Sequence, residues 1–231
     1  MPADGGGTAG GAPPSDLAGY PTRAVSVSLD GLDIRLVTVA DLAAYVDTAA
    51  LLRDADAPEP PYWAHLWPGS RALARRVAAG LARPGQRVLE VGCGLALAGI
   101  AAALRGAAVT LLDAAPEAAA FARANAARNA CRAGVVVADL SRPPLRGRFD
   151  LCLAADVTYD PFLQQALATL LYQHLAPGGV AVCAESVRTF DQRFQQACVD
   201  RGLTVEEEEA EEPDDGRPVR IRMTTVRAPA P

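Results

Sequence analysis

The segment from residue 88 to residue 99, VLEVGCGLALAG, constrains the fold more than any other part of the chain. An apolar run contains the acidic Glu90 near its end, a turn with Gly92 and Gly94 follows, and an Ala-rich run begins directly after it. Glycine lets the backbone of a turn approach a ligand closely, and the first turn of a helix leaves N–H groups free. The segment therefore predicts a strand, a tight turn and a helix, with a ligand at the turn.

The chain from Trp67 onward repeats this alternation of short apolar runs and longer Ala-rich runs. We expect strands at 87–92, 108–113, 134–139, 149–156 and 179–185. We expect helices at 68–82, 96–105, 115–130, 161–175 and 189–201. Strands that alternate with helices form a mostly parallel sheet covered on both faces. With a C-terminal antiparallel hairpin, the pattern predicts a doubly wound α/β domain around a seven-strand sheet.

The chain before this domain divides into two segments. Residues 1–22 are rich in Gly, Ala and Pro and are expected to form a disordered tail. Residues 23–60 are expected to hold a β-hairpin and a connecting segment, because alternating apolar and polar runs flank an Asp-Gly turn at 30–31. The domain itself is expected over residues 61–231.

The second hairpin is expected at the C-terminal end of the domain. An acidic run leads into the turn sequence PDDG at 213–216, and an alternating run follows it. The two-residue period of a strand predicts acidic and basic side chains across the hairpin from one another, with Glu207 and Glu209 facing Arg220 and Arg222. The acidic strand is either a solvated face or a lip that attracts a basic substrate.

Composition argues against several classes of function. The net charge of -5 over 231 residues argues against nucleic acid or an anionic membrane as the main partner. All 22 basic residues are arginine, as in a GC-rich, bacterial genome, so phosphate loops and Schiff bases that require lysine are excluded. Two histidines and five scattered cysteines predict no metal site. The chain shows no signal peptide and no run of ~18 apolar residues, so a cytoplasmic protein is expected.

The glycine spacing separates two ligand classes that use such a turn, dinucleotides and S-adenosylmethionine. A dinucleotide fingerprint that starts at Gly92 requires a small residue at position 97, where Leu97 is too large to let a pyrophosphate approach. The alternative spacing, E-x-G-x-G-x-G, resembles motif I of the seven-strand methyltransferases, with Ala96 in place of the third glycine. This resemblance implies S-adenosylmethionine as cofactor, bound by Glu90, Gly92, Cys93 and Gly94.

Acidic residues at the ends of the next two strands fit the same cofactor. Asp113 lies roughly twenty residues after the turn, where a carboxylate can accept both ribose hydroxyls, although it can instead cap the helix that begins near Pro116. In the methyltransferase pattern, an acid at Asp139 accepts a hydrogen bond from the adenine amino group. Asp139 can otherwise simply turn the chain into a loop. The sequence PGG at 177–179, ahead of the fifth strand, is also typical of this fold.

Two flanking segments resemble the family of small protein-lysine methyltransferases that includes the electron-transfer-flavoprotein β-subunit lysine methyltransferase. Residues 61–70, PYWAHLWPGS, contain the "YWA…WP" string that precedes the first helix in that family. Residues 156–159, DVTY, match the D-x-x-Y motif that closes its fourth strand. The likeness extends from about Pro61 to Glu185. It implies a Rossmann-like methyltransferase fold and methyl transfer from S-adenosylmethionine to a protein lysine.

The resemblance also implies roles for individual residues. Trp67 is expected near the methionine end of the cofactor, and Ala155 is expected to contact the cofactor from the fourth strand. Asp156 and Tyr159 are expected to act as catalytic residues that face the substrate. Asp156 can orient the attacking amine and stabilise the positive charge that forms, and an aromatic ring can hold a cationic amine by its π face; the candidates are Tyr159, Tyr62 and Trp63.

Alternatives to these assignments are open at this point. Asp156 can instead cap the turn before Pro161, and Trp63 and Tyr62 can be ordinary core residues. His65 can act as a base, although a structural role is favoured. The acceptor can be a small molecule methylated on N or O, but the short segment before the domain leaves the site open and favours a macromolecule. A non-catalytic partner subunit and a nicotinamide oxidoreductase are disfavoured, and a monomer is compatible with the sequence.

Overall fold

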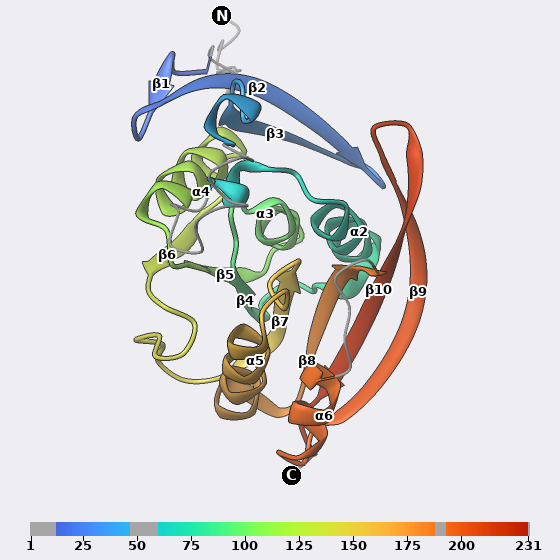
Figure 1. Cartoon of the computed structure of the whole chain (residues 1–231). Coiled ribbons are helices and arrows are strands. Elements are labelled where there is room, and N and C mark those ends of the chain that lie inside the picture. The colour runs from blue at the N-terminus through green and yellow to red at the C-terminus, as the bar shows by residue number, and fades with distance from the viewer. Residues whose placement is uncertain (1–12, 47–59, 188–192, 231) are drawn as a thin grey trace, which may run out of the picture.

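The computed structural model of the chain describes residues 13–46, 60–187 and 193–230. In chain order (Figure 1) its elements are β1 (Asp16–Leu17), β2 (Tyr20–Leu29), β3 (Leu32–Val39), η1 (Ala43–Tyr45), η2 (Tyr62–Ala64), α2 (Pro68–Arg76), η3 (Val77–Leu81), β4 (Arg87–Val91), α3 (Leu97–Leu104), β5 (Ala108–Asp113), α4 (Pro116–Arg128), β6 (Ala133–Val137), β7 (Phe149–Ala155), α5 (Pro161–His174), β8 (Leu175–Ser186), α6 (Arg193–Val199), β9 (Thr204–Asp214) and β10 (Arg217–Arg227).

Seven of the strands form one sheet in the order β6-β5-β4-β7-β8-β10-β9. Neighbouring strands from β6 to β8 are parallel, whereas β10 is antiparallel to both β8 and β9. The chain winds from β4 through β5 to β6, then returns to β7 on the other side of β4, so the strand order reverses between β4 and β7. The predicted doubly wound sheet with a C-terminal antiparallel hairpin is confirmed. Ligands of such sheets bind at the carboxyl ends of the strands at this switch point.

Helices cover both faces of the sheet (Figure 1). On one face, α2, α3 and α4 bury their Ala- and Leu-rich sides in one apolar cluster with the sheet, and on the other, α5 and α6 contribute to a second cluster. The strand β4 is buried along almost its whole length, as a strand covered on both faces requires. The predicted helix over 68–82 continues past Arg76 only as a π-helical turn, in which Gly80 has a φ of 111°.

The predicted N-terminal hairpin is confirmed. Leu29 lies opposite Leu32 in the register, and the two residues between them, Asp30 and Gly31, both have positive φ, as a type I′ turn requires. Ordered strand begins earlier than the boundary predicted at residue 22, because β1 starts at Asp16 and β2 follows it. Residues 1–12, which hold most of the predicted tail, lie outside the described residues.

This hairpin packs on α4 as a further, outer layer (Figure 1). The side-chain amide of Asn125 accepts a hydrogen bond from the Val37 N–H at 2.7 Å and donates to the Val37 carbonyl at 3.2 Å. Asn129 makes the same pair of bonds with Arg35 at 2.9 and 2.8 Å. Four helix residues rise about 6 Å and two strand residues span about 6.6 Å, so asparagines four apart match alternate residues of β3.

The C-terminal hairpin is also confirmed, with Asp215 and Gly216 in its two-residue turn. Arg222 lies opposite Glu209, and the Glu209 carboxylate forms ion pairs with Arg220 at 3.9 Å and Arg222 at 3.5 Å, as expected. The expectation for Glu207 is wrong. That residue lies opposite Thr224 in the register, and the residue opposite Arg220 is Glu211.

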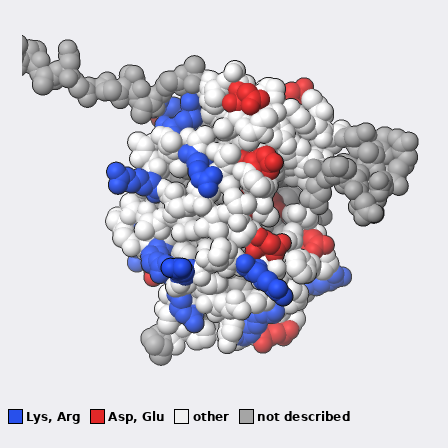
Figure 2. Space-filling model, turned by 90° about the vertical axis from the view of Figure 1, so that its left-hand side faces the viewer, with Lys and Arg blue, Asp and Glu red and all other residues white. Residues whose placement is uncertain are grey.

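The outer surface carries charges of both signs. On the side of the molecule that holds α4 and β6, arginine and acidic side chains are interspersed among uncharged residues (Figure 2). Within the described ranges, none of the helices is long and apolar enough to cross a membrane.

Candidate active site

A cavity of about 210 Å³ lies at the carboxyl ends of β4, β5 and β7, next to the switch point in the strand order. Its walls come from the turn after β4, the ends of β5 and β7, and the segment that leads into α2. Nine of the ten predicted site residues line it: Trp67, Glu90, Gly92, Cys93, Gly94, Asp113, Ala155, Asp156 and Tyr159. Residues predicted from four separate segments are therefore brought together.

The glycine turn requires residues without a Cβ. Gly92 and Gly94 have φ values of 60° and 47°, in the left-handed region that favours glycine. A Cβ on Gly94 would lie 2.6 Å from the Trp63 carbonyl oxygen, so the turn is packed directly against the segment that precedes α2. Ala96, the N-cap residue of α3, also has a left-handed φ of 63°. The missing third glycine is thus replaced by an alanine that adopts the same backbone conformation, at a cost of about 1–2 kcal/mol.

Glu90 fastens the start of α3 to β4. Its Oε2 atom accepts a hydrogen bond from the Gly99 N–H at 2.9 Å, and its side chain is buried. Burial raises the pKa of Glu90 to about 8, against the opposing effect of the Gly99 and Ala98 amides, and the nearby Asp113 raises the pKa further. The carboxyl group is therefore mostly protonated at pH 7.

Cys93 lies between the two glycines and is buried in the same wall. Its backbone N–H donates to the Leu112 carbonyl at 3.0 Å, which joins the turn to the end of β5. Burial raises the pKa of the Cys93 thiol well above its usual range. The side chain therefore acts as a small apolar group, not as a thiolate.

The Asp113 carboxylate is nearly buried and links two of the walls. Its Oδ2 atom accepts a hydrogen bond from the Gly94 N–H at 2.8 Å, and its Oδ1 atom accepts one from the Ala115 N–H at 3.0 Å. Burial raises the pKa of Asp113, and these amides oppose the rise. Each carboxylate oxygen has two lone pairs, so both can accept a further bond from a ligand. Ala115, not Asp113, is the N-cap residue of α4.

Asp139 is the one predicted site residue that does not line the cavity. Its neighbours Ala138 and Leu140 line it, whereas the Asp139 side chain is exposed. The Asp139 carboxylate accepts hydrogen bonds from the backbone N–H and the hydroxyl of Ser141. These bonds lower the pKa of Asp139. The observed contacts are those of a strand-end aspartate that turns the chain into a loop.

Asp156 directly follows β7 and has a left-handed φ of 53°. Its Oδ1 atom accepts a hydrogen bond from the Ser186 N–H at 3.2 Å. Its carboxylate lies against the N-terminus of α2, where a Cβ on Gly69 would approach Oδ2 to 2.3 Å. Burial raises the pKa of Asp156 to about 6, the Ser186 and Gly69 amides and Arg71 oppose the rise, and Asp214 adds to it.

The alternative role of Asp156 as a cap for α5 is not observed. Asp160 is the N-cap residue of that helix, and its Oδ1 atom accepts hydrogen bonds from the Phe162 and Leu163 N–H groups at 2.7 and 3.3 Å. The Asp156 carboxylate is thus not used by α5 and lines the cavity instead.

Aromatic side chains form much of the wall beside Asp156. The Trp67 indole N–H donates to the Tyr62 carbonyl at 3.0 Å, and the His65 ring packs edge-on against Trp67 with centroids 4.6 Å apart. Tyr62 and Tyr159 also line the cavity and are 42% and 59% exposed, so they lie at its mouth. Burial lowers the pKa of His65.

Trp63 serves both the core and the site. Its ring packs against Phe121 of α4, with centroids 5.0 Å apart, and against Tyr20 of β2 at 5.6 Å. The residue also lines the cavity, and its carbonyl is the group that faces Gly94. The alternative of a core residue is therefore partly correct for Trp63, but not for the more exposed Tyr62.

Sequence reasoning missed two polar contacts that hold the walls. The Ser70 hydroxyl donates to the Trp67 carbonyl at 2.7 Å, and the Asn125 amide donates to the Leu95 carbonyl at 3.1 Å. The spacing of Asn125 and Asn129, two asparagines four residues apart in an Ala-rich helix, was the available signal for the second contact.

Comparison with known proteins agrees with this geometry. Residues 88–179, from β4 into β8, match the family described as a methyltransferase domain. The part of the chain that forms the carboxyl-end cavity is thus similar to methyltransferase domains. Over 120 residues it is 38% identical to the electron transfer flavoprotein beta subunit lysine methyltransferase of Danio rerio. That match covers 50% of this chain and 44% of the relative, so less than half of the relative is represented.

Solved structures agree with the fold of the methyltransferase domain. A 16S rRNA methyltransferase of T. thermophilus, in complex with AdoMet and guanosine, is 16% identical, with a TM-score of 0.65 over 90% of this chain and 50% of the other. The magnesium protoporphyrin IX methyltransferase of Synechocystis PCC 6803, with bound SAM, is 17% identical, with a TM-score of 0.56 over 69% and 77%. A [4+2]-cyclase is 15% identical, with a TM-score of 0.58 over 69% and 81%, so the fold alone does not specify the reaction.

Proposed function

We propose that this protein transfers a methyl group from S-adenosylmethionine to a lysine amine of another protein. The observation that carries the proposal is the meeting of the glycine turn, the Asp113 carboxylate and the Asp156 carboxylate in one cavity at the switch point of the sheet. The likeness to a lysine methyltransferase over half of the chain supports lysine as the acceptor.

The residues of the cavity fit the cofactor. The turn at Gly92 and Gly94 offers backbone without a Cβ, and Asp113 keeps acceptor capacity on both oxygens for the ribose hydroxyls. We assign Trp67 and Ala155 to the remaining cofactor contacts, with Glu90 and Cys93 shaping the turn from behind. S-adenosylmethionine supplies a methyl group already activated on a sulfonium sulfur. The protein then has mainly to align the acceptor with it.

Asp156 and the aromatic mouth fit a lysine acceptor. A lysine amine has a pKa of ~10.4 in water and must lose a proton to water before it attacks. Apolar and aromatic walls favour the neutral amine by desolvation. With a pKa of about 6, Asp156 is ionised at pH 7 and can accept a hydrogen bond from the amine and stabilise the methylated cation. Tyr159 and Tyr62, exposed at the mouth, can hold the cation by their π faces.

Incubation with methyl-labelled S-adenosylmethionine and an extract of the host organism tests the proposal. We expect label on a discrete protein band, mapped to lysine, and much less label with the Asp156→Asn variant. The chain contains no lysine of its own, so methyl-lysine cannot arise by automethylation. Label confined to the small-molecule fraction would support small-molecule methylation instead, and no transfer to either fraction would contradict methyl transfer.

A further inference from the structure

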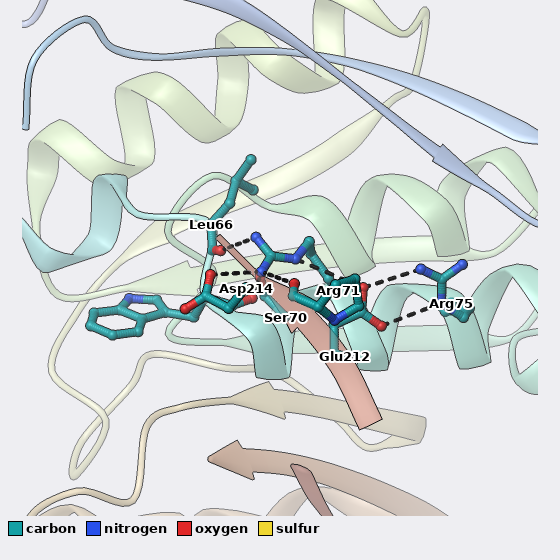
Figure 3. A network of polar contacts seen from close by, with 8 residues as sticks. Leu66, Ser70, Arg71, Arg75, Glu212 and Asp214 are labelled. Carbon is teal, nitrogen blue, oxygen red and sulfur yellow. Dashed lines mark hydrogen bonds and ion pairs between the residues drawn. The ribbon is translucent and has the colours of Figure 1, made fainter. Parts of the chain in front are cut away.

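One arginine, Arg71 on α2, joins the wall of the cavity to the C-terminal hairpin (Figure 3). Its Nη1 atom donates to the Leu66 carbonyl at 2.7 Å. Its Nη2 atom donates to the Pro213 carbonyl at 2.7 Å and to Asp214 Oδ1 at 2.9 Å. A single guanidinium group thus connects the segment before α2 to the last two residues of β9.

A buried carboxylate, that of Glu212, holds the Arg71 guanidinium group in place. Glu212, whose side chain is 4% exposed, forms ion pairs with Arg71 Nε at 3.8 Å and with Arg75 Nη2 at 3.1 Å (Figure 3). The Arg71 side chain is 20% exposed. A planar guanidinium presents its donors in a fixed fork, so fixing one edge against Glu212 also fixes the direction of the other N–H groups.

The contact at Leu66 acts on residues of the cavity. Leu66 lies between His65 and Trp67, and all three line the cavity. The Arg71 backbone N–H also donates to the Trp67 carbonyl at 3.2 Å. The same guanidinium group acts electrostatically on Asp156 and lowers its pKa, whereas Asp214 raises it. Arg71 therefore acts on the side of the cavity that carries Asp156. Within the described part of the chain, its guanidinium group bonds neither to the glycine turn nor to Asp113.

We propose that Arg71 is a positioning residue, which fixes the wall at residues 65–67 against the β9–β10 turn so that the acceptor amine is held beside Asp156. This inference rests on the function proposed above. It assigns a use to the last residues of the acidic strand β9, which hold Arg71 in place. This part of the strand is therefore neither only a solvated face nor a free acidic lip. Glu212 and Asp214 orient an arginine beside the cavity.

The matched control is Arg76, five residues after Arg71 on the same helix. Arg76 pairs with Glu208, so it also joins α2 to β9, but both side chains are about half exposed and neither lines the cavity. We expect Arg71→Met to lower kcat/KM for the acceptor at least tenfold while the Kd for S-adenosylmethionine changes less than threefold. We expect Arg76→Met to leave both values within twofold of the wild type.

The Arg71→Lys variant separates charge from geometry. An ammonium group keeps the charge near Asp156 but cannot reproduce the fork that reaches Leu66, Pro213 and Asp214 together. We expect Arg71→Lys to retain the defect in kcat/KM. Full activity in Arg71→Lys, or equal losses in the Arg71→Met and Arg76→Met variants, would overturn the positioning role.

A second readout does not depend on methyl transfer. The two tryptophans of the chain, Trp63 and Trp67, both line the cavity, so tryptophan emission reports on this wall. We expect a red shift in emission and faster amide hydrogen exchange in residues 62–67 for Arg71→Met and not for Arg76→Met. If the wild type transfers no methyl group, these signals still decide the inference, and unchanged signals would overturn it.

Discussion

Raising the pH from 7 to 9 should destabilise this protein through one buried side chain, Glu90. Burial raises the pKa of Glu90 to about 8 in the folded state from 4.5 in a solvated one. The folded state therefore holds a proton that the unfolded chain has already released. The stability that this proton contributes is fully present below pH 4.5 and is lost as the pH rises through 8.

The magnitude follows from these two values. At pH 7 the folded carboxyl is about nine-tenths protonated, which contributes about 1.4 kcal/mol to the free energy of unfolding. At pH 9 the contribution falls to about 0.1 kcal/mol. The loss of roughly 1.3 kcal/mol corresponds to a fall in Tm of about 3–5 °C for a chain of this size.

Other groups also titrate in this range, so the assay compares two proteins. Glu90→Gln keeps an oxygen that can accept the Gly99 N–H and stays neutral at every pH. Urea unfolding of the wild type and of Glu90→Gln at pH 7 and pH 9 gives four free energies of unfolding. We expect the wild type to lose roughly 1.3 kcal/mol more than the variant. Equal losses in the two proteins would refute the reasoning, because Glu90 would then be ionised or solvated at pH 7.

Three further predictions concern the glycine turn and Asp156. Gly94→Ala should lower stability by more than about 1 kcal/mol, because its Cβ would lie 2.6 Å from the Trp63 carbonyl oxygen; an unchanged melting temperature would contradict the packing described. Ala96→Gly should change the free energy of unfolding by no more than about 1 kcal/mol, because relief of left-handed strain of about 1–2 kcal/mol is largely offset by loss of a buried methyl worth about 0.8 kcal/mol; a larger change in urea unfolding would show that one term dominates. For Asp156, with a pKa of about 6, kcat/KM should rise as the pH increases through 6 and the carboxylate ionises; Asp156→Asn should lower kcat and abolish that limb of the profile.

The elements of the sheet could be predicted from sequence because each depends on its own residues. Short apolar runs between Ala-rich runs specify a sheet covered on both faces, and β4, β5 and β7 begin and end within about a residue of the expected positions. Boundaries were less accurate where pairing extends a strand beyond its apolar core. The strand β8 begins at Leu175, before the PGG sequence, and not at the predicted residue 179.

Most of the predicted site residues meet because they lie at or just after the ends of strands in one parallel sheet, whereas Trp67 comes from the segment that leads into α2. Residues at the carboxyl ends of such strands share an edge, so Glu90, Asp113 and Asp156 could be grouped without knowledge of their contacts. The direction of a side chain after the strand is set by loop geometry instead. This is why Asp139 could be placed at the correct strand end and yet lies outside the cavity wall, with its carboxylate bonded to Ser141.

Contacts between layers could not be predicted from sequence. Arg71 and Asp214 lie 143 residues apart, and their contact depends on where β9 packs relative to α2. Nothing in the acidic run distinguishes Glu212, which is buried against two arginines, from Glu209, which is half exposed. The use of β9 to orient residues beside the cavity follows only from the packing of the sheet edge.

Binding of S-adenosylmethionine to the purified protein, measured by titration calorimetry, tests the central claim most directly. We predict saturable binding of one molecule per chain, accompanied by a rise in Tm, and at least tenfold weaker binding to Asp113→Asn, which keeps the size of the side chain but removes its charge and one acceptor oxygen. No heat of binding and no thermal stabilisation at millimolar S-adenosylmethionine would contradict the account. Equal affinity of the wild type and Asp113→Asn would contradict the assigned site.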